Sequence, residues 1–138
     1  MTHLVMMTLM LLAVDEQAPA VEVTVTLESS DGYVYCALHN KPKAFPGDTS
    51  KAVATQRVKA KDKKAVCAFK KASPGVYAVA AYHDSNSNGE LDTNLFGIPS
   101  EGTAATNNAK GSFGPPKFED AKFELTSKGF KQTIAMSY

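Results

Sequence analysis

The sequence has few residues of several kinds, and each shortage argues against a class of protein. Fifteen basic and 14 acidic residues give a formal charge of only +1. Proteins that hold nucleic acid or adhere to anionic membranes have a larger basic excess, so neither partner is expected. The chain has three histidines and two cysteines, and the histidines are not clustered, so a transition-metal centre built from them is not expected.

Common catalytic motifs are also missing. Ser100 is not in a G-x-S-x-G turn, because the residue two positions before it is not glycine. Lys110-Gly111-Ser112 lacks the upstream glycine and strand of a phosphate-binding loop. His83 could act as a general base, but a structural hydrogen bond at a strand end explains it better. These absences favour a non-catalytic protein over an enzyme, and they leave the question of catalysis open.

No apolar run is long enough to cross a bilayer. The longest, Leu4–Val14, has the length of a signal-peptide core, although Met1-Thr2-His3 lacks the usual basic residue. Ala18-Pro19-Ala20 supplies small residues at positions −3 and −1 of a cleavage site. The sequence predicts a signal peptide at residues 1–20 and a periplasmic or extracellular domain at residues 21–138, with no stable membrane insertion after cleavage.

The rest of the chain is typical of one globular domain, with 43% apolar and 21% charged residues. In an oxidising compartment, Cys36 and Cys67 can form a disulfide. Two buried free thiols are the alternative, and the sequence does not decide between them.

Alternation of apolar and polar residues predicts about seven short strands and no convincing helix beyond a single turn near Glu119–Ala121. Val76–His83 is apolar on both faces, as expected for a central strand. Turn residues at 29–32 and at 61–63 each separate two strands that we expect to pair as a hairpin. Turn residues at 127–129 separate the last two predicted strands. The predicted fold is a single all-β, antiparallel sandwich of the immunoglobulin-like kind, with one long ordered loop. The predicted strands are residues 21–28, 33–39, 52–60, 64–69, 76–83, 121–126 and 130–137.

Residues 84–118 show almost no strand pattern. Loops this long are uncommon in compact domains and are usually functional or disordered. This one contains leucines and phenylalanines that require burial, so we expect it to be ordered and to carry the function.

The segment Asp84–Asp92 has the spacing of a calcium loop. Oxygen-bearing side chains occupy relative positions 1, 3, 5 and 9, and Gly89 occupies position 6, as in the first nine residues of an EF-hand loop. The predicted calcium ligands are Asp84, Asn86, Asn88, Glu90 (through its backbone carbonyl), Asp92 and, from further along the chain, Glu101.

The segment also differs from an EF-hand. Position 12 is Leu95 instead of a bidentate glutamate, and no helices are predicted on either side. Binding should therefore be weak, with a Kd of ~10⁻⁴–10⁻³ M. The alternative is a turn in which Asn and Asp side chains bond their own backbone without metal.

Two further clusters have both a functional and a structural interpretation. Asn107, Asn108 and Phe113 could form a ligand surface, or they could lie in a loop folded back on itself. Basic residues concentrate around the hairpin predicted at residues 52–69. A solvated, lysine-rich sheet edge explains this concentration, and an anionic polymer would need interleaved aromatic residues, which the local sequence does not show.

Longer motifs resemble a family of exported bacterial proteins known only as a domain of unknown function (DUF). They are the His83–Asn94 block (HDSNSNGELDTN), Phe96–Gly102 (FGIPSEG) and Phe113–Ala121 (FGPPKFEDA). The resemblance covers residues 21–138 and implies a secreted or periplasmic β-sandwich similar to prealbumin-like domains, without an assigned activity.

The interpretation favoured by the sequence is an exported binding or structural module. A calcium ion in its loop would order a face for a protein or glycan partner. The alternatives are a small hydrolase-like enzyme using His83, Asp84 and Glu101, and a carrier that holds an apolar small molecule between its sheets.

Overall fold

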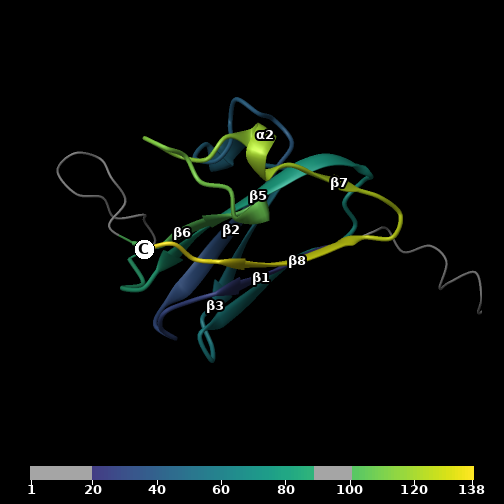
Figure 1. Cartoon of the computed structure of the whole chain (residues 1–138). Coiled ribbons are helices and arrows are strands. Elements are labelled where there is room, and N and C mark those ends of the chain that lie inside the picture. The colour runs from purple at the N-terminus through teal and green to yellow at the C-terminus, as the bar shows by residue number, and fades with distance from the viewer. Residues whose placement is uncertain (1–19, 89–100) are drawn as a thin grey trace, which may run out of the picture.

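The computed structural model of the chain describes residues 20–88 and 101–138, and within them it contains eight strands and a few short helical turns (Figure 1). The strands are β1 (Val21–Thr26), β2 (Tyr33–His39), β3 (Ala54–Lys59), β4 (Lys64–Phe69), β5 (Gly75–Asp84), β6 (Thr103–Ala105), β7 (Phe123–Leu125) and β8 (Phe130–Ala135). The helical turns are η2 (Thr49–Lys51), η3 (Thr106–Asn108) and α2 (Phe118–Ala121). No helix in the described part of the chain is long and apolar enough to span a membrane.

The strands form two sheets that pack face to face. One has the order β4-β1-β8, and the other has the order β3-β2-β5-β6 with β7 paired to the beginning of β5. The predicted all-β sandwich is therefore confirmed, and β5 is central, as its apolar faces indicated. The number of strands is eight because β6 lies inside the long loop, where three residues are too few to show alternation.

The prediction of a purely antiparallel sandwich is wrong at one place. β8 runs parallel to β1, with Val21 opposite Phe130 and Val25 opposite Ile134. Since β1 is the first strand and β8 the last, no turn dictates their relative direction. The parallel pair forms because β8 completes the apolar inner face begun by β1 and β4.

The predicted hairpin of β1 and β2 is wrong. The predicted hairpin of β3 and β4 forms only at its turn, where Lys61 and Lys64 exchange two backbone hydrogen bonds of 3.0 Å. β1 and β2, β3 and β4, and β7 and β8 each lie in different sheets or do not pair, so these turns carry the chain from one layer to the other. β1 pairs instead with β4, and β2 pairs with β3 and β5. A crossing turn and a hairpin turn use the same Gly, Ser and Asp residues, so the sequence does not distinguish them.

The core lies between the sheets and is built from the alternating inward residues of both. In β1, Val21, Val23 and Val25 are completely buried while the residues between them are half-exposed. A disulfide joins Cys36 of β2 to Cys67 of β4 and so links the two sheets through the core. A crosslink closing this 31-residue separation stabilises the fold by about 3–4 kcal/mol on the chain-entropy model.

The two sheets are also joined along both edges. On one side, the Gln56 side chain of β3 accepts a hydrogen bond from the Ala68 N–H of β4 at 2.7 Å. On the other side, Thr103 and Ser137 exchange two backbone hydrogen bonds of 2.8 and 2.9 Å. These bonds satisfy backbone groups of Ala68, Thr103 and Ser137, which are then not available to pair with another chain.

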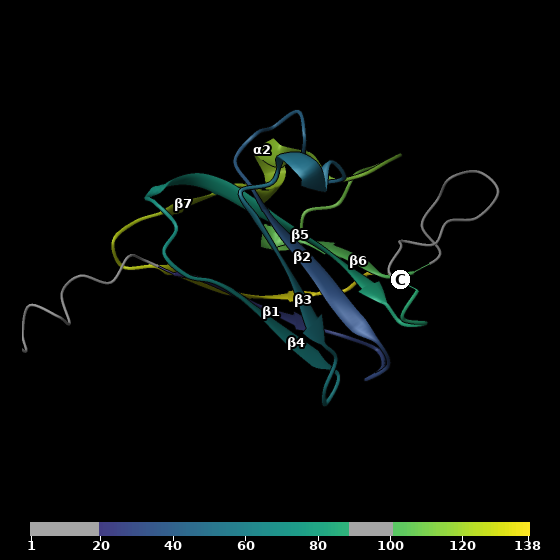
Figure 2. The ribbon, with the colours of Figure 1, turned by 180° about the vertical axis from the view of Figure 1, so that it is seen from behind.

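A second, smaller apolar cluster covers one end of the five-stranded sheet on its outer face. It contains Phe45, Ala78, Ala105, Phe118 and Ala121. Seen from behind, α2 and the segment at residues 40–51 lie beside the end of β2 and the middle of β5 (Figure 2). Neither α2 nor the segment at residues 40–51 covers the rest of this outer face.

Candidate functional site

The candidate cation loop begins at Asp84, the last residue of β5, whose side chain is fully buried. One carboxylate oxygen, Oδ1, accepts a hydrogen bond from the Asn88 N–H at 3.1 Å, and the Asn86 Oδ1 also accepts from this N–H at 3.2 Å. The Asp84 carbonyl accepts from the Ser87 N–H at 3.3 Å. The loop therefore turns back over its first carboxylate, so that Asp84, Asn86 and Asn88 gather at one end of β5.

Glu101 reaches the same loop from further along the chain. Its Oε2 accepts a hydrogen bond from the Ser85 N–H at 3.1 Å. The backbone holds it there, because the His83 N–H donates to the carbonyl of the next residue, Gly102, at 2.9 Å. A Cβ at Gly102 would lie 2.6 Å from a Tyr138 ring carbon, so a larger residue there would force the Tyr138 and Met136 side chains to move.

Gly32, the residue just before β2, packs against the beginning of the loop. It has a φ of +69°, and a Cβ there would lie 2.8 Å from Ser85 Cα, with the Asp84 carbonyl closer still. The approach of the two backbones at this point therefore requires glycine.

The structure thus brings together Asp84, Asn86, Asn88 and Glu101 of the six predicted ligands. Glu90 and Asp92 lie outside the described residues, as does Gly89. Within residues 20–88 and 101–138, no group of three or more His, Cys, Asp or Glu residues is placed to hold a metal. In the contacts given above, side-chain oxygens of Asp84, Asn86 and Glu101 accept from backbone N–H groups, and Asn88 supplies one of these N–H groups. The turn that was the alternative to calcium binding has such bonds.

His83 is buried and has hydrogen bonds to both ring nitrogens. Nε2 lies 2.6 Å from the Asp31 carbonyl, and Nδ1 lies 2.7 Å from the Tyr138 hydroxyl. Because a carbonyl only accepts, Nε2 carries the proton, and in the neutral ring Nδ1 accepts from Tyr138. The Tyr138 oxygen accepts in turn from the Glu28 N–H at 3.1 Å. This is the structural role that the sequence favoured for His83.

The position of Tyr138 changes its pKa, and the position of His83 argues against the hydrolase-like alternative. Burial raises the pKa of Tyr138, opposed by its hydrogen bond with the Glu28 backbone. His83 and Asp84 are consecutive strand residues, so their side chains point to opposite faces of the sheet. The imidazole is therefore not directed at the carboxylates with which it was grouped.

Asn107 and Asn108 lie side by side, but their side chains are used within the fold. Asn107 Oδ1 accepts from the Gln132 side-chain amide at 3.1 Å, and its Nδ2 donates to the Asp120 and Lys122 carbonyls at 3.2 and 3.0 Å. Asn108 Oδ1 accepts from the Ala135 N–H at 2.9 Å. Both residues have left-handed φ values, +62° and +52°, which asparagine tolerates.

These bonds attach η3 to β8 and α2, which is the folded-back structural interpretation of this segment. The third predicted ligand-surface residue, Phe113, is fully exposed. Consecutive asparagines are a known signal for left-handed turn positions, and that signal would have indicated their structural role.

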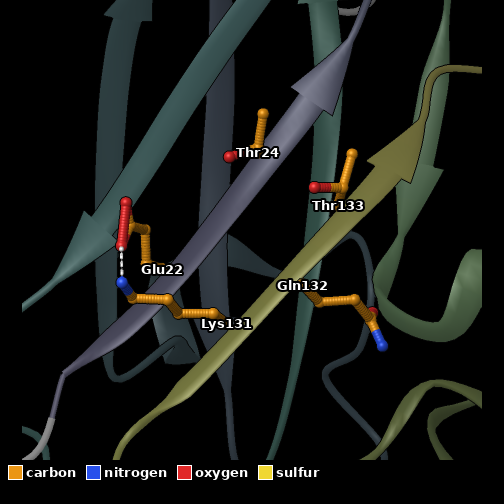
Figure 3. Close-up of a pocket in the computed structure, with 5 residues that line it drawn as sticks. All are labelled: Glu22, Thr24, Lys131, Gln132 and Thr133. Atoms are coloured by element: carbon orange, nitrogen blue, oxygen red, sulfur yellow. Dashed lines mark ion pairs between the residues drawn. The ribbon is translucent and has the colours of Figure 1, made fainter.

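An open pocket lies on the outer face of the parallel β1–β8 pair (Figure 3). Glu22 and Lys131 form an ion pair across it, with 3.6 Å between Oε1 and Nζ. The Lys131 side chain is 83% exposed, and exposed pairs of this kind contribute little to stability or binding. We assign no function to this surface. The residues that line it are Glu22, Thr24, Lys131, Gln132 and Thr133.

His39 is a buried polar residue that the sequence did not single out. It is completely buried against Phe45, and neither ring nitrogen has a hydrogen-bond partner among the described residues. Burial lowers its pKa below the usual 6.5. The Pro46 backbone and the Asp48 charge oppose this shift, but neither completes a hydrogen bond to the ring.

Together, these features define a small, disulfide-linked β-sandwich with a polar loop at the end of its central strand. The chain belongs to the family described as "Uncharacterized protein conserved in bacteria (DUF2141)", whose model matches residues 21–133. The bacterial family predicted from the His83–Asn94 block is thereby confirmed at the level of family membership. No curated protein and no solved structure matched the chain.

Proposed function

We propose that this protein is an exported, non-catalytic binding or structural module whose Asp84–Asp92 loop holds a calcium-type cation. The observation that carries the proposal is the position of Asp84, whose fully buried carboxylate lies at the first ligand position of the loop. Removing a carboxylate from water is costly unless a cation or several hydrogen bonds compensate for it. Asn86 Oδ1 and Asp84 Oδ1 accept from the same Asn88 N–H. Glu101 Oε2 accepts from the N–H of Ser85, the residue after Asp84. Oxygen is the donor type that calcium prefers.

The proposal includes export and a prealbumin-like variety of the sandwich. Strand β1 begins at Val21, directly after the predicted cleavage site, so cleavage would leave every described strand complete. Ala20 contributes one backbone hydrogen bond, to the Phe130 N–H at 2.9 Å. Expression of the full chain in a bacterium, followed by mass spectrometry of the secreted fraction, should give a protein that begins at Val21. Recovery only from the cytoplasm with residues 1–20 attached would contradict export.

Calcium should stabilise the chelator-treated protein by a small, saturable amount. With a Kd of ~10⁻⁴–10⁻³ M, about 1 mM calcium adds ~0.4–1.4 kcal/mol. At roughly 4 °C per kcal/mol for a domain of this size, Tm should rise by about 2–6 °C. Calorimetric titration should give one site of matching affinity.

Asp84→Asn and Glu101→Gln should remove the calcium-dependent rise in Tm, and Asp120→Asn is the matched control. Asp120 is exposed in α2 and far from the loop in sequence. If calcium changes neither Tm nor the heat signal of the wild type, the loop is the metal-free turn and this part of the proposal is wrong. Glu101→Gln retains an oxygen that can accept from Ser85, so it separates loss of charge from loss of fold.

The enzyme and carrier alternatives have less support. Both His83 nitrogens are occupied by structural contacts. The inward residues that would line a carrier cavity, such as Val34, Leu38 and Val79, pack in one continuous core with the disulfide.

A further inference from the structure

The outer face of the five-stranded sheet carries a group of side chains that the proposed cation loop does not use. Tyr33 and Tyr35 in β2 and Tyr82 in β5 alternate with buried inward residues, so they stand together on this face. Arg57 and Lys59 occupy exposed positions on the neighbouring strand β3, opposite Tyr35 and Tyr33. We call these five residues the tyrosine–arginine face.

The cations on this face are held against an aromatic ring. The Arg57 Cζ lies 3.6 Å from the centroid of the Tyr33 ring, and the Lys59 Nζ lies 5.3 Å from the same centroid. At 3.6 Å the guanidinium is in direct contact with the ring. A guanidinium that stacks in this way keeps its N–H donors directed outward in its own plane, where they can bind a carboxylate through two hydrogen bonds.

The cations of this face outnumber its carboxylates: Asp84, opposite Tyr33 in β5, adds one buried carboxylate beside Arg57 and Lys59. The ion pairs found in residues 20–88 and 101–138 are Lys51–Asp48, Lys122–Glu119 and Lys131–Glu22, and none includes Arg57 or Lys59. The turn that follows β3 adds further exposed lysines and one aspartate. The surface therefore has a local basic excess in a chain whose overall charge is only +1.

A pair of stacked tyrosines, Tyr35 and Tyr82, lies beside the two cations. The rings of Tyr35 and Tyr82 have centroids 5.0 Å apart and planes that differ by 7°. Rings that stack on each other hold their edges and hydroxyl groups at a defined spacing. The local sequence does not show this arrangement, because the aromatic residues are on β2 and β5 while the basic residues are on β3.

From this arrangement we propose that the tyrosine–arginine face binds an acidic polysaccharide, that is, a glycan with uronate carboxylates. One such ligand supplies a carboxylate for Arg57 and Lys59 together with many hydroxyl groups for the tyrosine edges. A nucleic acid would also supply anions, but it binds largely by stacking bases on open ring faces. Here the rings already contact a guanidinium or each other.

A protein partner fits this face less well. Protein interfaces are held mainly by apolar and aromatic anchors that fill pockets, whereas this surface consists of tyrosines with polar ends and two cations. The proposal goes beyond the cation loop, since none of the five residues is among the predicted calcium ligands. It can be tested with a chelator present, so its result does not depend on calcium binding.

The test measures binding of the immobilised protein to polygalacturonate. Three other polymers are compared with it: dextran as a neutral glycan, polyglutamate as an acidic peptide and a single-stranded oligonucleotide as a nucleic acid. Polygalacturonate should bind most tightly, and its binding should weaken as NaCl increases from about 50 to about 500 mM. The double variant Arg57→Gln, Lys59→Gln should bind about tenfold more weakly or worse. Tyr33→Leu should give an intermediate loss, because it keeps both charges but removes the ring that orders them.

The matched control is Lys128→Gln with Lys131→Gln, which removes the same charge from the β7–β8 turn and from β8 in the other sheet. It should bind polygalacturonate as the wild type does. An equal loss in both double variants would show that attraction is non-specific, and no binding by the wild type would overturn the proposal outright. Tighter binding of polyglutamate or of the oligonucleotide would assign the face to a protein or to a nucleic acid instead. All substituted side chains are exposed or half-buried, and unchanged Tm values verify that the variants fold.

Discussion

Breaking the Cys36–Cys67 disulfide should lower the stability of this protein without changing its fold. The bond joins β2 of one sheet to β4 of the other, and both cysteines are buried in the core. In the chain-entropy model, the cost of removing it depends on the number of residues it encloses. The separation of 31 residues gives a loss of about 3–4 kcal/mol.

This loss can be converted to a change in melting temperature. An unfolding entropy of roughly 2.1 cal/mol/K per residue, over the ~118 residues that follow the predicted signal peptide, gives about 4 °C per kcal/mol. Reduction should therefore lower Tm by about 12–16 °C. The assay is thermal unfolding followed by circular dichroism, with and without a reductant, on the same protein sample.

The double variant Cys36→Ala, Cys67→Ala separates the crosslink from the effect of the reductant. It should melt near the reduced wild type and should not respond to reductant. Its native circular dichroism spectrum should remain that of a β protein, because the surrounding valines and leucines still form the core. If oxidised and reduced wild type melt within about 2 °C of each other, the inter-sheet bond does not constrain the unfolded chain and the reasoning is refuted.

Two further predictions follow from buried polar groups. Burial lowers the pKa of His39, so below about pH 6.5 the unfolded chain binds a proton that the folded chain does not. The contribution of His39 to the free energy of unfolding should therefore be fully present above that pH. Below it, this free energy should decrease by at most about 1.4 kcal/mol per pH unit. His39→Leu should reduce this decrease, as measured by urea unfolding of both proteins from pH 7.5 to pH 5, and parallel pH profiles would contradict the assignment. Thr106→Val should lower the free energy of unfolding by about 2–4 kcal/mol in the same assay. The Thr106 hydroxyl donates to the Ala121 carbonyl at 2.6 Å and accepts from the Val79 N–H at 3.1 Å, and valine can do neither. A loss under about 0.5 kcal/mol would show that these bonds do not contribute.

The candidate site was predictable in part. The ligand spacing at 84, 86 and 88 is a local property, and the chain does turn back there onto a buried Asp84. The contacts of Glu101 depend on how β6 lies beside β5, which the local sequence does not specify. The structural role of Asn107 also depends on a distant partner, since its side chain bonds Gln132, 25 residues further along the chain.

The strands were predictable because the alternation of residues such as Val21, Val23 and Val25 depends only on the side-chain period of an extended chain. The choice of partner for each strand was not. β1 pairs with β4 and, in parallel, with the last strand, β8. Such contacts depend on which apolar faces are still uncovered when the two layers meet.

The sequence by itself therefore determined the all-β class, the central position of β5 and the polar loop at its end, since each follows from local periodicity or spacing. The tertiary structure decided the layer to which each strand belongs, the pairing of Cys36 with Cys67 and the assembly of Tyr33, Arg57 and Lys59 on one face. The physical reason is that neighbours across a sheet are set by hydrogen bonds and burial between distant segments, which leave no local pattern in the chain.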